Sequence, residues 1–184
     1  MSNSTDARKI VEVAQALGTK PEWLDALINF ETGGSYDPLQ PNMGGSSGKG
    51  LIQVMDSTAK TEFGVEDSSV LVLLYPTFDS QMDNVVLPYL KKYAPYTTQQ
   101  ALYMAVFYPK FMNVPPATPF PDYVQEANRN SRGEKVIVYV SDYIDLVNRR
   151  VKKGGLRLPF GLPSTVPILL IVGGVVLYLR LKNR

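Results

Sequence analysis

The chain has 184 residues with a formal net charge of +2, and it contains neither cysteine nor histidine. This composition excludes disulfide scaffolds, nucleophilic triads built on histidine, and zinc sites whose ligands are histidine or cysteine. Acid–base chemistry near neutral pH would have to come from a carboxyl group with a raised pKa, a lysine with a lowered pKa, or a tyrosine.

The charge divides the chain into two parts. Residues 1–148 carry eleven basic and seventeen acidic side chains, whereas residues 149–184 carry eight basic side chains and no acidic one. An acidic main part argues against nucleic acid as a specific partner. The basic C-terminal part needs an interpretation of its own.

The first predicted elements are two short helices. Apolar residues at helical spacing indicate a helix that ends at Gly18. Thr19 and Glu22 then predict a capping box, with Pro21 in the first turn of the next helix. We expect this second helix to reach Glu31, because Gly33 and Gly34 then stop it.

The stretch from Gly33 to Gly50 holds six glycines and two prolines, which predicts loops and tight turns. Pro88 predicts a kink in one of the later helices and Pro109 the end of another. The later helices are expected over residues 57–63, 77–93, 97–108 and 134–151, with a proline-rich loop over 113–122. No repeat and no pair of long alternating strands is present, so the fold class is mainly α.

Glu31 lies in an unusual place for a charged residue. Leu24, Leu27, Ile28 and Glu31 follow helical spacing, so the glutamate continues an apolar stripe. Burial and the negative end of the helix dipole would both raise its pKa, which suits a proton donor. The structural alternative is a glutamate at a frayed helix end that turns toward water.

Two segments carry a family resemblance. Residues 31–38 (ETGGSYDP) and 50–59 (GLIQVMDSTA) are separated by a glycine- and serine-rich loop. Together they resemble the soluble lytic transglycosylases, a lysozyme-like family, and in particular the virion-associated members encoded by phages. The resemblance covers roughly residues 6–151, and it implies a lysozyme-like helical domain.

The resemblance implies roles for particular residues. Glu31 corresponds to the catalytic acid/base and Gln53 to a glutamine of the substrate pocket. Residues 101–109 (ALYMAVFYP) are similar to the third motif of phage relatives, which would place Tyr103 near the carboxyl group. Cellular members have an asparagine after this tyrosine, and the chain does not. Tyr103 could instead be a core aromatic, and Gln53 a loop side chain bonded to backbone.

The implied substrate is the peptidoglycan glycan strand, cut at the β-1,4 bond between MurNAc and GlcNAc. Tyr36 is one of several tyrosines that could offer an aromatic face to sugars. Asp37 and Asp56 are candidates for a second carboxylate, but a turn and a helix N-cap explain them more simply. The family's scheme with one carboxylate yields a 1,6-anhydro product and needs no metal and no organic cofactor.

Two alternative functions use the same residues. A lysozyme-type glycoside hydrolase would use Glu31 with water as the acceptor. A non-catalytic, membrane-anchored virion protein would keep the fold only as a structural or glycan-binding module.

The C-terminal part has the pattern of a membrane anchor. Residues 160–179 are uncharged and rich in Leu, Ile and Val, and basic residues flank them on both sides. This pattern predicts a domain over residues 1–151, a basic linker over 152–160, and a single-pass anchor with a basic tail over 161–184. Lipid would contact residues 161–181. A buried core helix is the alternative.

The predicted location follows from the anchor and the N-terminus. Residues 1–6 are polar, and no continuous apolar segment typical of a signal peptide follows them. An anchored cellular enzyme would then face away from peptidoglycan. Carriage in a phage virion, in its internal membrane, would resolve this conflict, with the enzyme opening the host wall in the periplasm for genome entry. Other virion or membrane proteins are further candidate partners.

Overall fold

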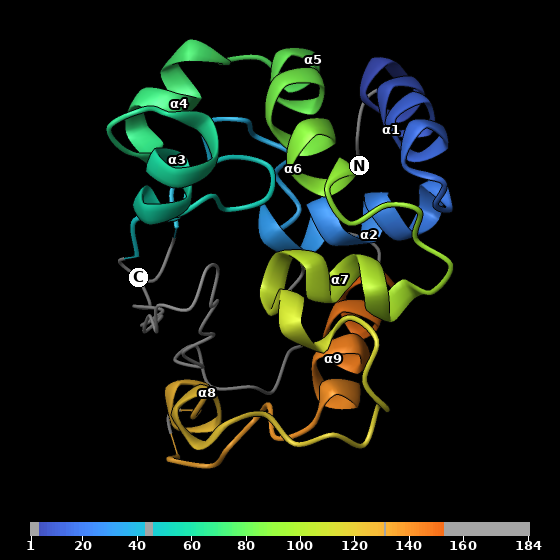
Figure 1. The fold of residues 1–184 in the computed structure, drawn as a ribbon, viewed down its shortest axis with the longest axis vertical. Helices are drawn as coiled ribbons and strands as arrows, with labels where there is room; N and C mark the ends of the chain where they lie inside the picture. The colour runs from blue at the N-terminus through green and yellow to red at the C-terminus, as the bar shows by residue number, and fades with distance from the viewer. Residues whose placement is uncertain (1–3, 43–45, 131, 153–184) are drawn as a thin grey trace.

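In the computed structural model, residues 4–42, 46–130 and 132–152 are described (Figure 1). The helices are α1 (Ser4–Leu17), α2 (Pro21–Glu31), α3 (Asp56–Phe63), α4 (Ser68–Leu74), α5 (Phe78–Gln81), the π-helical turn η1 (Met82–Val86), α6 (Leu87–Lys91), α7 (Gln99–Phe107), the 3-10 turn η2 (Pro109–Phe111), α8 (Asp122–Ala127) and α9 (Val140–Lys152). Within these residues, β pairing is limited to isolated bridges. The mainly α fold class is confirmed.

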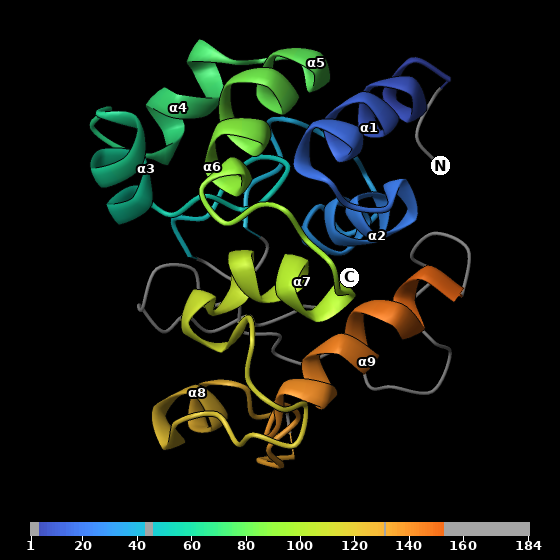
Figure 2. The same ribbon diagram turned by 45° about the vertical axis from the view of Figure 1, so that its right-hand side comes forward.

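Helix α2 lies at the centre of the helical packing. It contacts α1 on one side and both α7 and α9 on the other. Figures 1 and 2 show α1 to α6 gathered at one end of the molecule, with α8 at the opposite end beyond α7 and α9. Helix α2, which ends at Glu31, is therefore held by helices from both halves of the chain.

The junction between α1 and α2 corrects one prediction. Gly18 ends α1 as expected, in the left-handed region with φ +63°. The capping box of Thr19 and Glu22 is wrong, because Lys20 is the N-cap and no side chain caps α2. The N–H of Thr19 donates to Ala14 O at 3.0 Å, which makes Thr19 part of the last turn of α1.

The helix predicted over residues 77–93 is continuous but changes pitch. It begins with a capping box between Thr77 and Ser80, and it widens into the π-helical turn η1 just before Pro88. Proline lacks an N–H donor and its ring crowds the carbonyl one turn earlier. A wider turn before Pro88 accommodates the ring without ending the helix.

The last helix starts later than its periodicity predicts. Helix α9 begins at Val140, because the Asp142 carboxylate accepts the N–H groups of Val138 and Tyr139 at 2.9 and 2.7 Å and fixes the entry to the helix. The preceding residues make isolated bridges instead, one of them between Pro119 and Tyr139. Helices α4 and α8 were not predicted.

In the part of the chain that the structure describes, no helix combines the length and the apolar character needed to cross a bilayer. The predicted anchor over residues 161–184 and the basic linker after Lys152 lie outside the described residues.

Candidate functional site

Glu31 is the last residue of α2 and its side chain is buried, with 5% of its surface exposed. Leu24, Leu27 and Ile28 on the same stripe are fully buried. The apolar spacing therefore placed the glutamate correctly, inside the packing between helices rather than on a wet face. The alternative of a water-facing helix end does not describe its position.

Tyr143 donates a hydrogen bond to this carboxyl group. Its hydroxyl donates to Glu31 Oε1 at 3.2 Å, across 112 positions of sequence. The tyrosine is fully buried in α9, and its ring stacks on Phe107 with centroids 4.1 Å apart and an interplanar angle of 12°. Phe30 meets the same ring edge-on at 5.6 Å. This packing fixes the phenol relative to the carboxyl group.

The backbone that follows Glu31 is also held closely to α2. The Thr32 hydroxyl donates to Ile28 O at 2.7 Å and accepts the N–H of Tyr36 at 3.1 Å. Gly34 N–H donates to Asn29 O at 2.7 Å. The first turns of the glycine-rich stretch thus fold back onto the last turn of α2.

Tyr36 points its hydroxyl back at α2. The hydroxyl donates to Asp25 Oδ1 at 2.9 Å and accepts from Asn29 Nδ2 at 3.1 Å. Burial, with a contribution from the nearby Asp25 charge, raises the pKa of Tyr36 to about 12. The residue adopts φ +56°, a strained conformation for a non-glycine residue. Its ring is buried, so the proposed aromatic face is not presented to solvent.

Gln53 ties together the two ends of the glycine-rich stretch. Its Nε2 donates to Gln40 O at 3.2 Å and to Gly50 O at 3.0 Å, and its Oε1 accepts from Asn42 Nδ2 at 3.1 Å. The side chain is buried and the backbone has φ +50°. These bonds match the structural alternative for Gln53, a loop side chain bonded to backbone, with Asn42 as an additional partner.

Tyr103 is fully buried on α7, where residues 101–107 are all buried. Its hydroxyl accepts from Gln99 Nε2 at 2.9 Å, and burial raises the pKa of Tyr103 far above its ordinary value. Gln99 in turn exchanges two amide hydrogen bonds with Asn148 of α9, at 2.7 and 3.1 Å. The hydroxyl therefore joins a polar contact between α7 and α9, and Tyr103 has the position of a core aromatic.

The two other candidate carboxylates have structural roles. Asp37 accepts the N–H of Leu39 at 2.8 Å in a turn, as predicted. Asp56 is not an N-cap: Met55 caps α3, and Asp56 Oδ1 instead accepts the N–H and the hydroxyl of Ser68 at 3.0 and 2.7 Å. Partial burial disfavours the charged form of Asp56, but these bonds and the nearby Lys49 outweigh it, so the pKa of Asp56 is lowered.

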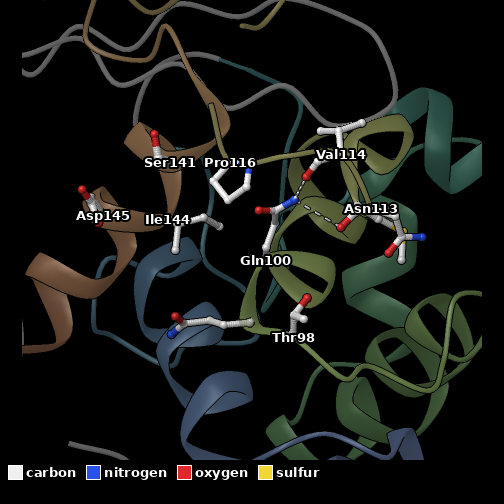
Figure 3. Close-up of a pocket in the computed structure, with 10 residues that line it drawn as sticks. Thr98, Gln100, Asn113, Val114, Pro116, Ser141, Ile144 and Asp145 are labelled. Atoms are coloured by element: carbon white, nitrogen blue, oxygen red, sulfur yellow. Dashed lines mark hydrogen bonds between the residues drawn. The ribbon is translucent and has the colours of Figure 1, made fainter. Parts of the chain in front are cut away.

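A pocket of about 670 Å³ lies between α7, α9 and the segment over residues 112–116 (Figure 3). Glu31, Gln53, Tyr36 and Tyr103 do not line it. Among the described residues, no group of three acidic side chains is close enough to hold a metal ion.

The arrangement places a buried carboxyl group beside a fixed phenol at the end of a helix, next to a glycine-rich turn. Such a group can give and take a proton once a substrate reaches it. Tyr143 lies within the helix predicted over residues 134–151 but was not among the predicted site residues. A buried tyrosine needs a partner for its hydroxyl, and this was the signal that could have identified it.

Comparisons of the chain with protein-family models, with curated proteins and with solved structures return no match. The resemblance described above therefore depends on the residues that carry it.

Proposed function

We propose that the protein is a peptidoglycan lytic transglycosylase with a lysozyme-like helical domain and that Glu31 is its catalytic acid/base. The observation that carries the proposal is the burial of Glu31 at the end of α2 against the Tyr143 hydroxyl. A surface glutamate would stay ionised near neutral pH, whereas a desolvated one can hold the proton that a leaving oxygen requires. The mainly helical body around this end of α2 is compatible with the fold.

In the proposed reaction, Glu31 first donates its proton to the glycosidic oxygen as the bond to MurNAc C1 breaks. The N-acetyl group of the sugar stabilises the positive charge that develops there. The Glu31 carboxylate then removes the proton from the C6 hydroxyl of MurNAc, and the C6 oxygen bonds to C1. The product is a 1,6-anhydro sugar, the proton returns to Glu31, and no water is consumed.

Tyr143 and Gln53 have supporting roles in this scheme. Tyr143 is a positioning residue, since it fixes one carboxyl oxygen from the α9 side. Gln53 fixes the glycine-rich turn through its hydrogen bonds to Gln40 O and Gly50 O, and it has no sugar-binding role in this scheme. Substrate has to bring its glycosidic oxygen within hydrogen-bond reach of the carboxyl group, so the turns around Glu31 must part when it binds.

We further propose that residues 161–184 anchor the domain in a membrane and that a phage virion carries the protein for wall opening during genome entry. The uncharged run over residues 160–179 and its basic flanks support the anchor. The similarity of residues 101–109 to the motif of phage relatives supports the virion. Purified virions that lack the protein would contradict this part of the proposal.

The decisive experiment compares Glu31→Gln with the wild-type chain on purified sacculi, with mass spectrometry of the released muropeptides. We expect wild-type protein to release 1,6-anhydro ends and Glu31→Gln to release almost none while keeping its helical circular dichroism. Glu22→Gln is the matched control, because Glu22 is an exposed glutamate in the first turn of the same helix. Reducing ends would assign a hydrolase instead, and a wild-type protein that binds sacculi without cutting them would assign a glycan-binding module.

A further inference from the structure

The pocket between α7 and α9 is a second site, separate from Glu31. Its volume of about 670 Å³ falls within the range of small-ligand pockets. It is lined by Thr98, Gln99, Gln100, Met112, Asn113, Val114, Pro116, Ser141, Ile144 and Asp145. Ser141 and Asp145 are each two residues from Tyr143 and so lie about 160° around α9 from it. Helix α9 therefore stands between the pocket and the carboxyl group.

One wall of the pocket presents fixed hydrogen-bond acceptors. Gln100 Nε2 donates to Val114 O at 2.7 Å and to Met112 O at 3.4 Å, which sets the orientation of the amide. Its Oε1 consequently points toward Ile144 and Pro116, as Figure 3 shows. Asp145 adds an exposed carboxylate, and the described residues that line the pocket include no lysine or arginine. This wall suits a ligand that carries N–H donors or an ammonium group.

The start of α7 supplies donors on another side. Thr98 caps the helix by accepting the N–H of Ala101 at 3.1 Å. The N–H groups of Gln99 and Gln100 belong to the same first turn, which has no acceptors of its own for them. Such groups, together with the helix dipole, favour carbonyl or carboxylate oxygens. Thr98, Gln99 and Gln100 all line the pocket, so this first turn borders it.

The remaining lining is aliphatic. Met112, Val114, Pro116 and Ile144 form this surface, and the part of the lining that the structure describes holds no aromatic ring. Sugar rings commonly lie against aromatic faces, whereas methyl groups pack equally well on aliphatic side chains. The lining therefore favours small aliphatic side chains on a peptide over a sugar ring.

From these features, we infer that the pocket binds a short peptide with small side chains and a free ammonium group. Given the proposed function, on which this inference depends, the peptide is the stem peptide attached to the glycan strand. Asp145 would take the ammonium group, and the aliphatic lining would take the methyl groups of alanine residues. The site would hold a strand by its peptide while its sugar backbone is cut at Glu31.

The inference is tested by titrating the full-length chain, in detergent, with a soluble tetrapeptide of the stem sequence that carries a diamino acid. We expect amide chemical-shift changes in the NMR spectrum at Gln100, Ser141 and Asp145. Asp145→Lys should weaken the affinity by about tenfold or more, because it replaces the partner of the ammonium group with a like charge. Glu66→Lys makes the same charge change at an exposed position between α3 and α4 and should leave the affinity unchanged.

Further variants and a second ligand separate the possible outcomes of the titration. Ile144→Trp narrows the pocket without changing its charge and should also reduce binding. Because this variant acts through shape rather than charge, the test does not depend on the folding of Asp145→Lys alone. Glu31→Gln should bind the peptide as wild type does. Equal affinity in Asp145→Lys, or chemical-shift changes at the pocket with peptide-free glycan instead of peptide, would overturn the inference. Cleavage of sacculi without peptide binding would refute the pocket alone, and peptide binding without cleavage would refute the proposed function alone.

Discussion

Gly50→Ala perturbs the turn that carries Gln53 at a point where the structure leaves no room for a side chain. Gly50 has φ +80°, and a Cβ placed there would lie 2.5 Å from Gln81 Oε1. That oxygen accepts the N–H of Leu51 at 3.0 Å, and the Gln81 amide also donates to Pro38 O. An alanine would have to displace the amide that joins both ends of the glycine-rich stretch to the α5 region.

Two terms contribute to the expected loss of stability. The left-handed conformation costs an alanine about 1–2 kcal/mol. Displacing Gln81 leaves the buried N–H of Leu51 without its acceptor, which costs about 1–3 kcal/mol more. We therefore expect Gly50→Ala to lower the free energy of unfolding by about 2–5 kcal/mol. The same displacement should reduce the cleavage of sacculi, since it loosens the segment that resembles the second motif of the lytic transglycosylases.

Urea unfolding followed by helical circular dichroism measures this loss, with the full-length chain in the same detergent throughout. Gly64→Ala is the matched control. Gly64 also has a positive φ, of +68°, but a Cβ there would meet nothing within 4 Å. Only the backbone term should appear in this control, at about 1–2 kcal/mol.

A double-mutant cycle with Gln81→Ala isolates the clash. Once the Gln81 amide is removed, Gly50→Ala should cost only its backbone term. The summed losses of unfolding free energy in the two single variants should therefore exceed the loss in the double variant by about 1–3 kcal/mol. Additivity within about 0.5 kcal/mol would refute the reasoning, because it would mean that the two positions do not interact.

Two further predictions concern Tyr143 and Asp56. Tyr143→Phe keeps the ring on Phe107 but removes the hydroxyl from Glu31. The rate constant for sacculus cleavage should fall about tenfold, with a loss of unfolding free energy of only about 1 kcal/mol. An unchanged rate constant would show that Tyr143 does not position Glu31. The lowered pKa of Asp56 means that its carboxylate stabilises the fold at pH values above its ordinary pKa near 4, and this contribution is lost as the pH falls through the folded-state value. Thermal melts should therefore separate wild type from Asp56→Asn at pH 7, the two curves should converge toward pH 3, and a constant gap would contradict the assignment.

The position of Glu31 could be predicted because the signals are local. Apolar spacing over three turns of helix fixes which face is buried, and the two glycines that follow Thr32 fix where the helix ends. The same logic placed most of the longer helices. It failed at the start of α9, where Asp142 caps the helix through its side chain, and the apolar period alone cannot locate such a cap.

The partners of the candidate residues could not be predicted, because they come from distant parts of the chain. Tyr143 reaches Glu31 over 112 positions, and Gln81 reaches Pro38 over 43. Gln53 is similar, since its amide could serve a sugar or a loop equally well until the carbonyls of Gln40 and Gly50 are placed beside it. Short helices such as α4 and α8 have too few turns to produce a period.

Helix α9 connects the features on which the proposed function depends. Tyr143 on one face holds Glu31, Asn148 joins the helix to Gln99, and Asp145 on the far face lines the peptide pocket. Both faces belong to one rigid element, so a strand held by its peptide at Asp145 is held in a fixed relation to the carboxyl group. The pocket would therefore orient the strand as well as bind it, because it would favour the orientation that places the scissile bond at Glu31.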